Sequence, residues 1–134
     1  MNPAIVIPSY WSNEERLGES GSVACYDHAT PIDTPAPQLA DCLKSLEQVA
    51  GLGSVIILVV ASPDVEERAV HRVSDIAAAS GLPDVVIVDS FKAAGLRDQY
   101  ARMLPAELSG AIGLVGYGAV RNLGLVVACA LGFD

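Results

Sequence analysis

Residues 55–60, Val-Ile-Ile-Leu-Val-Val, constrain the fold more than any other part of this chain, because six apolar residues follow one another without a polar one between them. A strand with one wet face alternates apolar and polar residues, whereas an unbroken β-branched run is typical of a parallel strand buried on both faces. Parallel neighbours are joined by crossovers that are usually helical. The run therefore predicts an α/β protein with helices on both sides of a sheet.

Two more apolar runs predict strands of the same sheet. Residues 4–7 predict a first strand that ends at Pro8, since proline cannot donate to a ladder, and residues 85–88 predict a third. Periodicity and capping residues predict helices from Thr34 to Gly51, from Ser62 to Gly81, over 96–104 and through 120–131. In the last two of these helices we expect Met103 and Leu131 to be buried. This order favours a doubly wound fold, a Rossmann-like three-layer sandwich with a mainly parallel sheet.

The charge and composition favour one acidic domain. The chain has 134 residues, a net charge of −8 and 51% hydrophobic residues, which is enough for one substantial core. A nucleic-acid groove needs clustered cations, so we do not expect nucleic-acid binding. No apolar run reaches the roughly 20 residues of a transmembrane segment, and no basic n-region opens the chain, so we expect a cytoplasmic protein. Three cysteines without C-x-x-C spacing indicate neither disulfides nor zinc.

Residues 12–34 interrupt this pattern as a long loop within the single domain, 1–134. They contain turn-forming glycine and proline and show no apolar period. A loop of this length inside a compact domain is usually functional or disordered. The cluster Tyr26-Asp27-His28 lies here, but one histidine with one acid specifies neither a metal site nor a catalytic base.

Polar and aromatic residues follow the first two strands, at the carboxyl ends where open α/β sheets bind ligands. Tyr10 and Trp11 offer flat faces to a base or a sugar, or alternatively cover the edge of the core without a ligand. The candidate ligand-binding residues are Pro8, Ser9, Tyr10 and Trp11 after the first strand, and Ser62 and Asp64 after the second.

The stretch 116–124, Gly-Tyr-Gly-Ala-Val-Arg-Asn-Leu-Gly, has two interpretations. In the first, its three glycines form a turn and a helix N-terminus that present Arg121 and Asn122 to a phosphorylated ligand. Arg121 then pairs with a phosphate through its planar fork or, alternatively, with a neighbouring carboxylate. The second is a dinucleotide fingerprint, which we disfavour because Arg121 stands where close helix–strand packing requires the third glycine.

These motifs together resemble the inverting, family 2-like glycosyltransferases. Residues 5–10, Ile-Val-Ile-Pro-Ser-Tyr, are similar to the opening strand of that family, and residues 38–49 to the helix that follows. Residues 118–125 with Ala128 are similar to its Ala-Arg-Asn-x-Gly helix. The resemblance implies a partial GT-A fold that binds a nucleotide-diphosphate sugar, the donor for transfer to an acceptor. It implies nucleotide contacts from the six residues after the strands and from Arg121 and Asn122.

The resemblance also implies a divalent metal, Mg²⁺ or Mn²⁺, which that family holds with an Asp-x-Asp motif on the strand after this helix. The sequence reaches Asp134 without that motif. We therefore expect no metal ligands and no identifiable catalytic base in this chain, and we expect this donor half to be inactive alone. An incomplete sheet would have an open apolar edge, from which we expect a homo-oligomer.

Two other function classes stay open. The missing metal motif and the lack of a Ser/His/Asp or Cys/His arrangement favour a non-catalytic α/β ligand-binding or interaction domain. A dinucleotide-dependent oxidoreductase would bind NAD(H) at the turn around Gly116.

Overall fold

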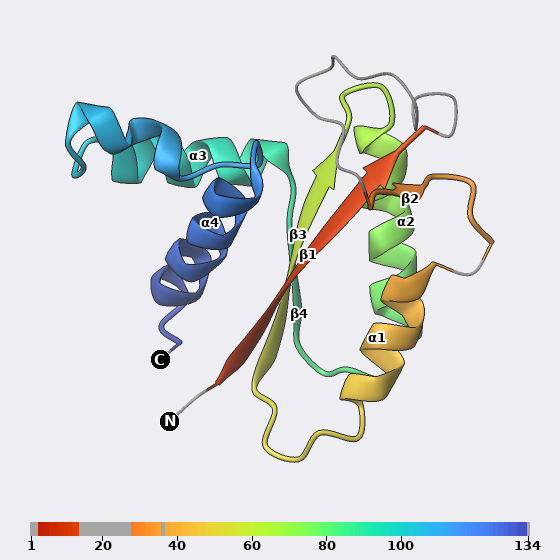
Figure 1. Ribbon diagram of the computed structural model, residues 1–134. Helices are drawn as coiled ribbons and strands as arrows, with labels where there is room; N and C mark the ends of the chain where they lie inside the picture. The colour runs from red at the N-terminus through yellow and green to blue at the C-terminus, as the bar shows by residue number, and fades with distance from the viewer. Residues whose placement is uncertain (1–2, 14–27, 36, 134) are drawn as a thin grey trace.

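Four parallel strands form one open sheet in the part of the chain that the computed structural model describes, residues 3–13, 28–35 and 37–133. The sheet order is β2-β1-β3-β4, with β1 at Ala4–Ser12, β2 at Thr30–Pro31, β3 at Ser54–Ala61 and β4 at Val85–Val88. One face is covered by α1 (Gln38–Leu46) and α2 (Glu66–Ala79). The other is covered by α3 (Ser90–Ala101) and α4 (Tyr117–Ala130), with the 3-10 helix η2 (Ala106–Ala111) between them (Figure 1). The predicted α/β class and Rossmann-like three-layer sandwich are confirmed.

The β3 strand lies at the centre of both apolar cores. Its odd-numbered residues, Val55 to Val59, pack with α1 and α2, whereas Ile56, Leu58 and Val60 pack with α3 and α4. Each of these side chains is almost wholly buried. Two-sided burial is what an unbroken apolar run predicts, so this part of the sequence analysis is confirmed.

The first strand continues through Pro8 to Ser12, beyond its predicted end. The carbonyl oxygen of Trp11 accepts a hydrogen bond from the β3 side, from Ser62 N, whereas that of Ser12 accepts one from Ile32 N beside β2. Backbone groups of successive strand residues point in opposite directions, so even-numbered residues of β1 face away from β3. The nitrogen of Pro8 therefore faces the edge of the sheet, where its missing N–H removes no bond to β3.

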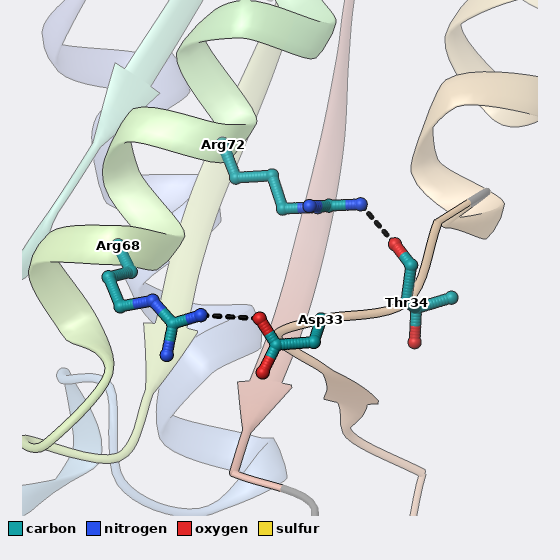
Figure 2. Close-up of polar contacts among 4 residues, drawn as sticks. All are labelled: Asp33, Thr34, Arg68 and Arg72. Carbon is teal, nitrogen blue, oxygen red and sulfur yellow. Dashed lines mark hydrogen bonds and ion pairs between the residues drawn. The ribbon is translucent and has the colours of Figure 1, made fainter.

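The first helix begins at Gln38, four residues after the predicted cap at Thr34, so that predicted start is wrong. Two arginines one turn apart on α2 hold the preceding segment: Arg68 pairs with the Asp33 carboxylate, and Arg72 donates to the carbonyl oxygen of Thr34 (Figure 2). These contacts fasten the segment after β2 to α2. The carbonyl oxygen of Thr34, which would accept the first intrahelical bond of a helix capped at Thr34, accepts from Arg72.

The second helix has the predicted buried stripe of Ala69, Val73 and Ala77, and His71 is exposed as expected. The α3 helix starts earlier than predicted, because the Asp89 carboxylate caps it by accepting a hydrogen bond from Lys92 N at 2.9 Å.

Met103 and Leu131 are not buried, contrary to expectation. The side chain of Met103 is 76% exposed and that of Leu131 is 48% exposed. Both follow the last residue of a helix, so the helical periodicity that predicted burial no longer applies to them.

The glycines of the last motif do not form one turn. Gly116 alone has the left-handed φ of 86° that a turn before α4 requires, whereas Gly118 and Gly124 lie within the helix. Gly124 is buried against β1, and a Cβ atom added to it would lie 2.6 Å from Cγ1 of Val6. The absent side chain therefore sets how closely α4 approaches β1.

We predict that Gly124→Ala lowers the free energy of unfolding by up to about 2 kcal/mol. The overpacked contact costs roughly 1 to 3 kcal/mol, because Val6 is β-branched and its χ1 is stiff, and helix propensity returns only about 1 kcal/mol. Gly95→Ala is the matched control in α3, since nothing lies within 4 Å of its added Cβ and only the gain in propensity remains. Urea unfolding of both variants measures the difference. Equal stability of the two would contradict a packing role for Gly124.

Candidate functional site

A groove of about 590 Å³ runs between the outer edge of β1 and α4. It opens on the edge of β1 that faces away from β3. Its lining residues are Val6, Pro8, Tyr10, Tyr117, Arg121 and Leu125.

The strand and the helix line this groove in antiparallel register. At the carboxyl end of β1 the ring of Tyr10 meets the ring of Tyr117 edge to face, with centroids 5.5 Å apart and an interplanar angle of 63°. Further down, Val6 lies against Gly124. Two residues of a strand span about 6.6 Å and four residues of a helix about 6 Å, so every second residue of β1 lies opposite about every fourth residue of α4. Pro8 and Arg121 therefore lie between these two contacts.

Arg121 is the only charged side chain among the described residues that line the groove. It is exposed, and along the groove it lies between the pair of tyrosine rings and the aliphatic side chains of Val6 and Leu125. A guanidinium group presents five N–H donors in one plane and binds phosphate or carboxylate oxygens in pairs. The groove can therefore accept an anion that carries an apolar or aromatic group.

Asn122 is turned toward η2 and does not line the groove. Its Nδ2 donates a hydrogen bond to the carbonyl oxygen of Ala111 at 2.8 Å. This bond ties the first turns of α4 to the end of η2, which is a structural role.

Ser9 and Trp11 face the opposite side of the sheet from Pro8 and Tyr10, as alternation along a strand requires. Trp11 is only 1% exposed and packs in the core formed with α1 and α2. Its Nε1 donates to Ser9 Oγ at 2.8 Å, so both polar atoms are satisfied within the protein. A base cannot stack on Trp11 in this arrangement, and the core-covering alternative describes its position.

Ser62 lies at the end of β3, beside Ser12, a residue that the sequence analysis missed. The hydroxyls of Ser62 and Ser12 are both buried and have no hydrogen-bond partner among the described residues. Ser62 is also joined to β1 through its N–H, which donates to the carbonyl oxygen of Trp11. Asp64 follows on the exposed turn before α2. Ser12 carries no distinctive sequence signal, because only its position beside the neighbouring strand makes it a candidate site residue.

The described residues do not fit a divalent metal. Among them, no three His, Cys, Asp or Glu side chains gather as a metal site would require, and the groove is lined by a cation and no carboxylate. Mg²⁺ and Mn²⁺ prefer carboxylate and other oxygen ligands. His28, from the cluster singled out in the loop, is exposed, and Tyr26 and Asp27 lie outside the described residues.

None of the helices in the described part of the chain is both long and apolar enough to cross a membrane.

Comparisons with known proteins add no relative to this picture. No family model matches the sequence, and neither the curated proteins nor the solved structures gave a match. The similarity to glycosyltransferases is therefore a similarity of motifs.

We predict that Trp11, the single tryptophan of the chain, gives blue-shifted fluorescence that acrylamide quenches poorly, because its indole is buried and hydrogen-bonded. Ser9→Ala should lower the free energy of unfolding by about 1 to 3 kcal/mol by leaving the indole N–H unsatisfied. Ser45→Ala is the control, since that exposed hydroxyl bonds only within α1, and it should change stability by less than about 0.5 kcal/mol. Emission like that of free tryptophan would show that Trp11 is available to a ligand.

Proposed function

We propose that this chain is the donor-nucleotide-binding part of a glycosyltransferase, one that moves a sugar from a nucleotide-diphosphate sugar to an acceptor. One observation supports this function above others. Pro8 and Tyr10, from the motif at the start of the chain, and Arg121, from the motif near its end, line the same groove. The two motifs lie far apart in the sequence and were identified independently of each other, yet the fold brings them to the same groove.

Within this proposal the residues have different roles. Arg121 pairs with the phosphates, and Pro8 and Tyr10 form the strand side of the site. Ser62 and Asp64 contact the part of the ligand that extends over the carboxyl end of β1. Ser9, Trp11 and Asn122 shape the site from behind through the contacts described above.

Sugar transfer with inversion also requires a general base for the acceptor hydroxyl and positive charge near the departing diphosphate. Among the described residues that line the groove, Arg121 is the only candidate for the second requirement, and that lining contains no carboxylate or histidine for the first. We therefore limit the proposed activity of this part to donor binding, and we expect no turnover from the chain alone.

We predict that UDP or GDP raises the melting temperature of the protein and that Arg121→Ala weakens binding roughly 10-fold or more, because a charge-assisted pair to phosphate is lost. Arg97→Ala is the matched control: it also removes an exposed helical arginine, but one that contacts Asp98 on α3. Calorimetric titration gives the two affinities. Equal affinities for Arg121→Ala and the wild type would remove Arg121 from the site.

A non-catalytic ligand-binding or interaction domain is the second candidate. The mainly apolar lining of the groove and the lack of a metal-ligating cluster among the described residues favour it. Such a domain would bind a small apolar anion as well as it binds a nucleotide. A nicotinamide-dependent oxidoreductase would instead show a fluorescence change on titration with NADH.

We also propose that the protein forms a homo-oligomer through the outer edge of β1. Among the described residues, no strand lies beside Ala4 to Pro8 on that side, since β2 pairs only with the end of β1. Edge backbone groups of this kind pair readily with another chain. Pro8 removes one donor from the edge and so weakens the pairing without abolishing it.

We predict a concentration-dependent dimer by light scattering and sedimentation. Leu125→Lys, which places a charge beside the edge on an exposed residue, should shift the equilibrium toward monomer. Phe91→Lys is the control, because Phe91 is also exposed but follows β4, the strand at the opposite edge of the sheet. A monodisperse monomer at high concentration would contradict the oligomer.

A further inference from the structure

Tyr117 lies within the 116–124 motif and lines the groove, but it was not among the predicted ligand-binding residues. It is the first residue of α4, and its position follows from the left-handed turn at Gly116. The side chain is 47% exposed although its ring contacts Tyr10. Because the two rings meet edge to face and are not stacked in parallel, Tyr10 covers Tyr117 only in part.

The spacing along α4 connects this ring to the cation. Tyr117 and Arg121 are four residues apart, so they lie on the same side of the helix about 6 Å apart along its axis. Both line the groove, and in the described part of its lining no charged side chain lies between them. A ligand in the groove therefore meets an aromatic surface at the carboxyl end of the sheet and a planar cation one turn further along.

We propose that Tyr117 is a specificity-determining residue on which the base of the donor nucleotide stacks, while the phosphates lie one helical turn away at Arg121. A nucleotide has a planar ring and an anionic group joined by a sugar, which is the order of groups that the groove offers. Tyr10 supports the ring of Tyr117 from the strand side. Stacking depends on the face of a base and little on its identity, so this contact selects nucleotides over other phosphates.

Because this inference rests on the proposed donor binding, its test separates the two. The probes are UDP, GDP and inorganic pyrophosphate, with affinities measured by calorimetry for the wild type, Tyr117→Leu, Tyr117→Phe and Arg121→Ala. Tyr117→Leu keeps an apolar side chain and removes the ring, and it should weaken binding of the preferred nucleotide roughly 10-fold. Pyrophosphate binding should not change in this variant. Tyr117→Phe should bind as the wild type does, and Arg121→Ala should weaken both kinds of ligand.

Nucleotide binding that depends on Arg121 and is equal in Tyr117→Leu would overturn the stacking role while the donor site stands. A wild-type protein that binds neither nucleotide would overturn both. If Tyr117→Leu does not fold, the wild type decides by NMR: the ring protons of Tyr117 should shift on addition of the nucleotide and stay in place on addition of pyrophosphate. Unshifted ring protons at saturating nucleotide would likewise overturn the stacking role.

Discussion

Burial of β3 on both of its faces is the constraint on which the rest of this structure depends. Its alternate side chains belong to two separate cores, one closed by α1 and α2 and the other by α3 and α4. An apolar strand of this kind has to lie between layers, and the layers have to be joined by crossovers, so its neighbours run parallel to it. The carboxyl ends of these strands then meet at one end of the sheet, which brings Tyr10, Ser12 and Ser62 into one region.

The approach of α4 to β1 sets the shape of the groove between them. Gly124 lets the helix lie directly on Val6, and the residues on either side of this contact are then carried into register with the strand. Tyr117 meets Tyr10 at the top, and Arg121 occupies the space beside Pro8. A side chain at position 124 would collide with Val6 and hold α4 away from β1 at this contact. The close packing at Gly124 therefore also determines how near the groove-lining residues of α4 lie to those of β1.

The alternation of side chains along β1 divides a short motif between the core and the groove. Ser9 and Trp11 satisfy each other's polar atoms in the core, while Pro8 and Tyr10 line the open groove on the other face. The same alternation turns the nitrogen of Pro8 away from β3, so the proline that seemed to end the strand instead limits pairing at its outer edge. The groove and this edge therefore both belong to β1.

Local patterns in the sequence determined the α/β class, the three layers, the two-sided burial of β3 and the buried stripe of α2, because periodicity and β-branching act within a few residues of chain. Tertiary structure alone decided which edge of β1 has no partner strand among the described residues, how the segment before α1 is held and which candidate residues meet. That segment is bonded to Arg68 and Arg72, which are far from it in sequence. Pro8, Tyr10 and Arg121 share a groove, and Asn122 and Trp11 are turned away from it. Tyr117, part of the same motif as Arg121 but not a predicted site residue, lines the groove as well. A sequence pattern shows that a residue lies on a strand or a helix, but only the packing of distant elements determines what its side chain faces.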